Sequence, residues 1–180
     1  MERIHFLYLK ILCFGGVDMN LTTKERLLLE DQKNHEQICI QKYSNYANMA
    51  SDQQLKDIFT NNGKIEQEHL NSINQLLSGQ IPSTNSQQSG GNANQQQQQQ
   101  QQSGSFTPQN GSTNYNNSDK ELCTDMLMTE KYVSGAYDTA IFEFQDTQAR
   151  NVLNHIQKEE QQHGEAIFNY MNSNGMYSAQ

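Results

Sequence analysis

The sequence lacks three features that would assign it to familiar classes of protein. It has no cluster of basic residues for nucleic acid: 12 Lys and Arg stand against 20 Asp and Glu, a net charge of −8, whereas phosphate backbones are bound by clustered Lys and Arg. Its three cysteines, Cys13, Cys39 and Cys123, are odd in number and unpaired in spacing, which indicates a reducing compartment without disulfides. No apolar run approaches the about 20 residues that a membrane-spanning helix needs. We therefore expect neither nucleic acid nor a membrane as a partner.

The first eighteen residues are apolar enough to suggest a targeting signal, but the match is poor. Glu2 lies where a signal peptide is basic, Lys10 interrupts the apolar run, and no small-residue cleavage site follows. The Gly-Gly pair at 15–16, followed by a short spacer, can be encoded by a bacterial ribosome-binding site. We expect residues 1–18 to be a translated leader or a disordered extension, with Met19 as the native start. A native peptide from within this stretch would contradict that expectation.

A lack of charge divides the rest of the chain. Residues 79–118 contain no charged side chain, and 34 of these 40 residues are Gln, Asn, Ser, Gly or Thr, with eight consecutive Gln at 95–102. Such a segment cannot bury enough apolar surface to offset the entropy lost on ordering, so it is predicted to be a disordered linker. It separates a first flank, 19–78, from a second flank, 119–175, and residues 176–180 form a tail.

Each flank predicts two long helices. Apolar residues recur every three or four positions over 23–50, 52–78, 119–144 and 147–174. Capping residues precede these stretches; they are Thr22 with Glu25, Ser51 with Gln54, Ser118 with Glu121, and Asp146. Gly79 and Gly175 suit the left-handed position just past a helix end. Each helix is about 40 Å long at 1.5 Å per residue, a length that is typical of a long four-helix bundle.

The two flanks are related by an internal duplication. They align without a gap at an offset of 94 residues, with ten identical pairs in 47 positions, about three times the number expected by chance from this composition. The pairs at the centre of the helices are Glu36/Glu130, Tyr43/Tyr137, Glu66/Glu160 and His69/His163. A duplicated helical hairpin is the simplest account of this pattern.

Every predicted helix carries a glutamate near the middle of its apolar stripe. In the second helix of each flank, a histidine follows three residues later and shares the same face. The six residues are Glu36, Glu66, His69, Glu130, Glu160 and His163. Four carboxylates are costly to bury together unless cations join them. This arrangement of two Glu and two Glu-x-x-His is the ligand pattern of ferritin-like di-iron and di-manganese bundles. We therefore predict two iron or manganese ions, with Tyr43 and Tyr137 placed to bond a ligand.

A less specific interpretation of these carboxylates stays open. They could be protonated, or they could reach the rim of the bundle, with Glu36 beside Lys33 in solvent. The remaining unusual residues have simpler expected roles: buried small side chains, surface histidines, helix caps, and glycines tolerated within helices. In that order they are Cys39 and Cys123, His35 and His155, Asp52 and Asp146, and Gly135 and Gly164.

Four segments of the second flank, DMLMTEK, SGAYDTA, EEQQHGEAIFNYM and NGMY, resemble the Coat F family of spore coat proteins from spore-forming bacteria. The stretch LTTKERLLLEDQKNHEQICIQKYSNYA is similar to the opening of the same proteins. The resemblance implies a ferritin-like fold and a location in the spore coat, assembled from the mother-cell cytoplasm with other spore coat proteins as partners. It implies no activity for the central residues.

Two functions follow from the sequence. The first is a structural component of the spore coat, in which exposed Gln and Tyr side chains on flexible backbone serve as crosslinking substrates. The alternative is a di-iron or di-manganese oxidase or catalase-like enzyme that acts on dioxygen or peroxide, so the enzyme question is open. A plain interaction module built on the Gln tract is a third reading. Two hairpins on a long tether could also be exchanged between chains in a homodimer.

Overall fold

The computed structural model describes residues 19–82 and 117–177. It contains four helices, α1 (Thr23–Met49), α2 (Gln53–Leu77), α3 (Asn117–Glu143) and α4 (Thr147–Ser173), and no strand within the described ranges. The predicted all-α bundle of two hairpins is confirmed, and every helix end lies within two residues of its expected position. No helix in this part of the chain is long and apolar enough to cross a membrane. The expected leader (1–18), almost all of the expected linker and the last three residues lie outside the described residues.

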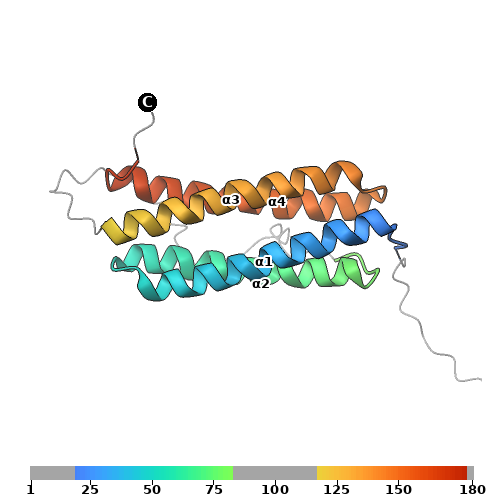
Figure 1. Ribbon diagram of the computed structural model, residues 1–180, viewed down its shortest axis with the longest axis horizontal. Coiled ribbons are helices and arrows are strands. Elements are labelled where there is room, and N and C mark those ends of the chain that lie inside the picture. The colour runs from blue at the N-terminus through green and yellow to red at the C-terminus, as the bar shows by residue number, and fades with distance from the viewer. Residues whose placement is uncertain (1–18, 83–116, 178–180) are drawn as a thin grey trace, which may run out of the picture.

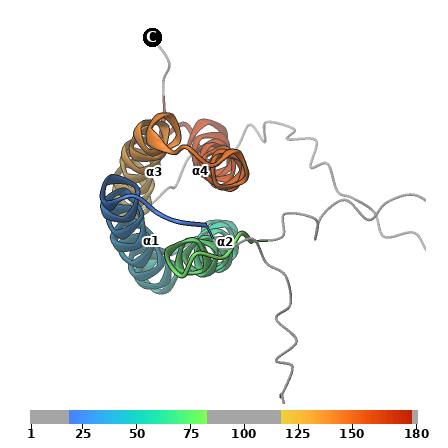
Figure 2. The same cartoon turned by 90° about the vertical axis from the view of Figure 1, so that its right-hand side faces the viewer.

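The two hairpins pack side by side into one bundle (Figures 1 and 2). Helix α1 contacts α2 and α3, and α4 contacts α3 and α2. Every neighbouring pair is antiparallel, so α2 ends at the opposite end of the bundle from the start of α3 (Figure 1). Bundles with one long crossover connection have this topology.

Local side chains set the helix starts. Thr22 and Glu25 form the predicted capping box at the start of α1. The N-cap of α2 is Asp52, whose carboxylate accepts a hydrogen bond from the backbone N–H of Leu55 at 3.0 Å. The prediction that Ser51 caps α2 is therefore wrong. Asp52, which the sequence also predicts to be a cap, takes that role, and carboxylates cap as well as hydroxyls do.

The remaining helix ends follow the predicted pattern with one exception. Asp146 caps α4 through hydrogen bonds from the backbone of its first turn. Gly79 and Gly175 have φ of 83° and 66° and close α2 and α4, as predicted. Each lies in a Schellman motif, which needs a left-handed residue at this position. The exception is Ser118, which lies inside the first turn of α3 rather than before it.

Two buried carboxylates join the hairpins at opposite ends of the bundle. Asp119 on α3 accepts hydrogen bonds from the backbone N–H groups of Ser51 and Asp52, at 2.8 and 3.2 Å. At the other end, Glu25 on α1 accepts one from the backbone N–H of Gln145, at 2.9 Å. Residues 25 and 119 are related by the same offset of 94 as the rest of the duplication. Each hairpin therefore binds the turn of the other.

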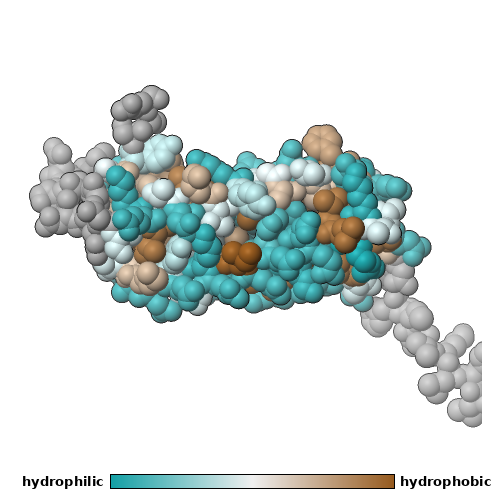
Figure 3. All heavy atoms as spheres, in the orientation of Figure 1, coloured by the Kyte–Doolittle hydropathy of each residue, from teal (hydrophilic) through white to brown (hydrophobic). Residues whose placement is uncertain are grey.

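Apolar side chains fill the core on both sides of a polar centre. The largest fully buried residues include Phe59, Leu29 and Leu55. Cys39 and Cys123 are fully buried, as predicted, and both are free thiols among the described residues. The face shown in Figure 3 is largely hydrophilic, with separate apolar patches. A core of this kind holds the four helices in fixed register, which determines what meets at their midpoints.

The surface histidines and helical glycines behave largely as expected. His155 is exposed, whereas His35 is half-buried with its ring edge-on to Tyr132. Gly135 is exposed, and a side chain there would meet no atom within 4 Å. Gly164 differs, because a Cβ at that position would contact the facing helix α3.

Candidate metal centre

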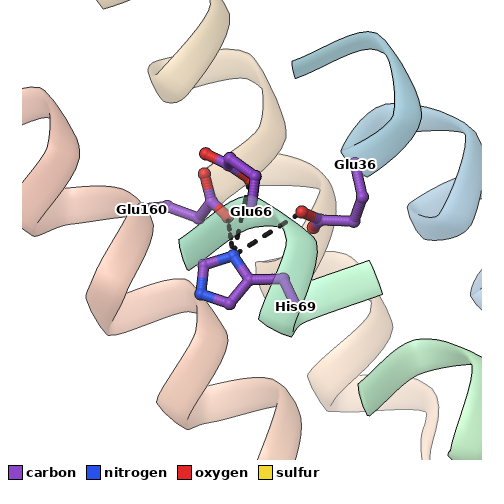
Figure 4. Close-up of side chains that lie close together, drawn as sticks. All are labelled: Glu36, Glu66, His69 and Glu160. Carbon is purple, nitrogen blue, oxygen red and sulfur yellow. Dashed lines mark ion pairs between the residues drawn. The ribbon is translucent and has the colours of Figure 1, made fainter. Parts of the chain in front are cut away.

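The six predicted residues meet at the middle of the bundle, and none is more than 2% exposed. Helices α1 and α3 each supply one glutamate, and α2 and α4 each supply a Glu-x-x-His pair. Figure 4 shows four of them, Glu36, Glu66, His69 and Glu160, pointing toward one another from three helices. This burial excludes the interpretation in which the carboxylates reach solvent at the rim. It leaves the protonated and metal-bound interpretations.

The six side chains form two overlapping groups of ligand atoms. One group is Glu36, Glu66, His69 and Glu160; the other is Glu66, Glu130, Glu160 and His163. Within each group, one atom from every residue lies within 4.8 Å of the others. Glu66 and Glu160 belong to both groups, so each is placed to bridge two positions. We name the positions after their histidines, the His69 position and the His163 position.

The centre concentrates unpartnered polar atoms. Nine buried side-chain nitrogen and oxygen atoms in the described ranges have no hydrogen-bond partner, and all nine belong to these six residues. They are Glu36 Oε2, both carboxylate oxygens of Glu66 and of Glu160, Glu130 Oε2, His69 Nδ1, and both ring nitrogens of His163. Buried polar atoms in folded proteins are almost always hydrogen-bonded. Nine exceptions at one point therefore indicate that positive charge belongs there.

The contacts of the His69 ring show that a proton or a metal ion is required between the ring and the central carboxylates. Its Nε2 donates a hydrogen bond of 2.9 Å to Glu159, because a carboxylate can only accept. Its Nδ1 lies 3.0 Å from Glu160 Oε1 and 3.5 Å from oxygens of Glu36 and Glu66, without hydrogen-bond geometry. A neutral ring would then direct a lone pair at three carboxylates. Either a second proton or a metal ion must lie between them.

The two central tyrosines bond glutamates across the hairpin interface. The Tyr43 hydroxyl donates to Glu130 Oε1, and the Tyr137 hydroxyl donates to Glu36 Oε1. The prediction that each tyrosine bonds a glutamate of the centre is confirmed, although the partner lies on the other hairpin because α1 and α3 run antiparallel. Each bond occupies Oε1 and leaves Oε2 of the same glutamate directed inward. Asn62 donates in turn to the Tyr43 hydroxyl at 3.1 Å.

Burial dominates the electrostatics of the centre. It raises the pKa of Glu36 and of Glu160 to about 7, with the charge of Glu66 adding to both shifts. It raises the pKa of Glu66 and of Glu130 as well, and it lowers the pKa of His163 to about 4. His69 is the exception: burial lowers its pKa, but contacts with Glu159 and the central carboxylates outweigh burial and raise it well above the ordinary value. Without metal, the carboxylates and His69 therefore hold protons near neutral pH. Two divalent cations would neutralise four carboxylates and replace those protons.

Two residues that bond the side chains of the centre, Glu159 and Asn62, were not predicted from the sequence. Glu159 lies one residue before a predicted ligand in a polar stretch, so it reads as a solvent-facing residue, and its side chain is 18% exposed. Its partner, His69, lies on another helix. Asn62 lies on the apolar stripe of α2, where its burial could be foreseen but its tyrosine partner could not.

This geometry defines a helical bundle with a buried carboxylate–histidine centre. Residues 118–180 match the Coat F domain. The resemblance of the second flank to the Coat F family is thereby confirmed, and the matched range covers α3 from its second residue and all of α4. The family implies a location in the spore coat and other coat proteins as partners. No curated protein and no solved structure matches the chain. The likeness of the first flank to the opening of Coat F proteins lies outside the matched range and stays a prediction.

Proposed function

We propose that this chain is a structural protein of the spore coat that holds a dinuclear iron or manganese centre inside a ferritin-like bundle. The Coat F match supports the location, and assembly from the mother-cell cytoplasm is part of the proposal. The observation that carries the metal is the convergence of nine unpartnered polar atoms on one point of the core. Protein interiors rarely leave even one such atom without a partner.

The residues divide into three roles in this proposal. Glu36 and Glu130 each bind one ion and are oriented by a tyrosine hydroxyl on the opposite hairpin. Glu66 and Glu160 belong to both ligand groups and would be shared by the two ions. His69 and His163 supply one nitrogen to each, and in both rings it is Nδ1 that faces the four central glutamates.

The donor set favours iron or manganese. Carboxylate oxygen and imidazole nitrogen suit these metals, whereas thiolates favour zinc or copper(I). Cys39 is buried in the same core and belongs to neither ligand group. Burial raises the pKa of its thiol far above the ordinary range, and the surrounding glutamates raise it further. Cys39 therefore stays a neutral apolar side chain.

Metal analysis of the purified protein tests the proposal. We expect two iron or manganese ions per chain after growth with either metal. Glu66→Ala and Glu160→Ala should each reduce this to less than one, while Glu68→Gln, an exposed substitution on the same helix as Glu66, should change nothing. Wild-type protein with less than one ion per chain under both growth conditions would leave the structural role alone.

An enzymatic role is the second candidate, and the tyrosines bonded directly to Glu36 and Glu130 favour it. Bound iron or manganese would supply redox chemistry toward dioxygen or peroxide. The chain itself binds and orients the ions and excludes water, since the six residues are almost fully buried. Consumption of peroxide by metal-loaded protein, lost in Glu66→Ala, would support this role. Metal-loaded protein without such turnover would exclude it.

The proposed structural role includes crosslinking through the Gln tract and the tyrosine-containing tail. The tract lies outside the described residues, so its part of the idea rests on composition alone. The tail tyrosine, Tyr177, is half-buried with its ring edge-on to Phe168, so the expectation of an exposed phenol is wrong for this residue. Extraction of coats under mild denaturant provides the test. Quantitative release of monomer would exclude crosslinking, and retention in the insoluble fraction with isopeptide or dityrosine bonds would support it.

A further inference from the structure

The two histidines of the centre differ in what holds their outer nitrogen. Nε2 of His69 donates to Glu159 at 2.9 Å. The duplication places Ile65 at the position equivalent to Glu159 in the first hairpin. Accordingly, Nε2 of His163 is buried and has no hydrogen-bond partner in the part of the chain that the structure describes. One ring is fixed by a carboxylate, and its equivalent is not.

The surface above the centre differs between the hairpins as well. A pocket of about 340 Å³ between α3 and α4 includes two of the ligands, Glu130 and Glu160, in its lining. Gly164 and Ser134 also line it, and their equivalents in the first hairpin are the larger Leu70 and Ile40. A pocket between α1 and α2, with Ile40 and Gly63 in its lining, includes none of the six residues.

We propose that the two metal positions have different tasks. The His69 position retains its ion. The His163 position exchanges its ion, and it takes up a small anionic ligand, of the azide or peroxide class, from the α3–α4 pocket. This inference rests on the dinuclear centre proposed above, and it adds a division of labour and a place for an external ligand.

The physical reason for unequal affinity lies in Glu159. A carboxylate that accepts a proton from the outer nitrogen fixes the tautomer and orientation of a ligating histidine and makes its inner nitrogen a better donor. Loss of such a partner typically weakens metal binding by about 10–100-fold. His69 has this support and His163 lacks it. Glu159 is thus a positioning residue that acts through His69.

The reason for ligand uptake at the second position lies in the shape and charge of the pocket. Glycine at 164 leaves space over the ligand Glu130, because a Cβ there would lie 3.9 Å from the Cβ of Glu130 and 3.7 Å from Leu127. Lys131 lines the same pocket beside Glu130 and Glu160, and it supplies positive charge for an anion once bound metal neutralises those two carboxylates. The residue at the equivalent position in the first hairpin is the larger Leu70.

Metal titration of the metal-free protein with Mn²⁺ tests the first half of the proposal. Wild type should bind two ions with dissociation constants about 10–100-fold apart. Glu159→Ala should weaken the tighter site by a similar factor, and Glu159→Gln should restore part of the loss because the amide oxygen still accepts a hydrogen bond. Ile65→Glu should strengthen the weaker site by supplying His163 with a partner. Glu165→Gln, an exposed substitution on α4, is the control.

Azide binding to iron-loaded protein, followed by its charge-transfer absorption, tests the second half. Gly164→Leu, which copies the residue at position 70, should weaken azide binding at least tenfold while both metal affinities stay within twofold. Gly135→Leu, at an exposed helical glycine with no neighbour within 4 Å, should leave azide binding unchanged. Unchanged azide binding in Gly164→Leu would overturn the assignment of the pocket.

The outcomes separate this inference from the proposed function. Wild-type protein that binds no metal would contradict both the dinuclear centre and the division of labour between its two positions. Two ions of equal affinity, or a Glu159→Ala effect confined to the weaker site, would overturn the division of labour and leave the dinuclear centre intact. Loss of the tighter site alone in Glu159→Ala, together with a strengthened weaker site in Ile65→Glu, would establish it.

Discussion

The two hairpins have equivalent residues at the centre of the bundle and different residues immediately around it. Each supplies one glutamate, one Glu-x-x-His pair and one central tyrosine, and each binds the turn of the other through a buried carboxylate. Around the histidines they diverge, with Glu159 opposite Ile65 and Gly164 opposite Leu70 in the duplication. The agreement accounts for a shared binding site, and the divergence accounts for two unequal halves of it.

The largest expected effect comes from removing a bridging carboxylate, and it should be the same in both hairpins. Glu66→Gln or Glu160→Gln should abolish stoichiometric metal binding. Because burial raises the pKa of Glu160 from 4.5 to about 7, the metal-free fold loses stability as pH rises through this range, and the loss is complete above it. The same variants, which keep a neutral amide in place of the buried charge, should therefore raise the unfolding free energy of metal-free protein at pH 8 by about 1–3 kcal/mol. Denaturant unfolding with and without chelator measures both signs, and a loss of stability without metal would contradict the account.

The carboxylates at the bundle ends should give the next largest effect. Asp119→Ala leaves the backbone N–H groups of Ser51 and Asp52 without their acceptor, at a cost of about 1–3 kcal/mol. Glu25→Ala should cost a similar amount, since it removes both the bond from Gln145 and the capping box. Urea midpoints measure the change. Values within 0.3 kcal/mol of wild type, a threshold below the about 1 kcal/mol of one hydrogen bond, would show that the hairpins dock without these contacts.

The tyrosines should reveal an asymmetry in stability. Tyr43→Phe leaves Asn62 without its partner, whereas the residue equivalent to Asn62 in the second hairpin is Ile156. Tyr43→Phe should therefore destabilise metal-free protein by about 1 kcal/mol more than Tyr137→Phe. Paired thermal and urea unfolding of the two variants gives the comparison. Equal losses would mean that the Asn62 contact contributes nothing.

The smallest expected effect lies on the surface between α1 and α3. Burial opposes ionisation of Asp125, but Lys42 at 2.6 Å and the Tyr46 hydroxyl lower its pKa below the ordinary value. A lowered pKa means that the contribution is present above the unfolded pKa and is lost as pH falls through the folded one. Because Asp125 is about half exposed, Asp125→Asn should cost at most about 0.5 kcal/mol at pH 7 and less in high salt. A larger loss that persists in 1 M salt would contradict this screening argument.

Periodicity and duplication predicted the four helices and the meeting of the six central residues. Apolar stripes predicted all four helices, and the equal spacing of Glu36 and Glu130 from their Glu-x-x-His motifs placed the six residues at one depth. Contacts that depend on how the hairpins dock could not be predicted from the sequence. Nothing local distinguishes Glu159 from the exposed Glu165, and the pairing of Tyr43 with the opposite hairpin follows only from the antiparallel packing of α1 on α3.

Anomalous diffraction from crystals of protein grown with manganese or iron tests the central claim most directly. The account predicts two anomalous peaks in the core, one beside Nδ1 of His69 and one beside Nδ1 of His163, with Glu66 and Glu160 bridging them. A core without anomalous density, in which protons join the same carboxylates and histidines, would contradict it.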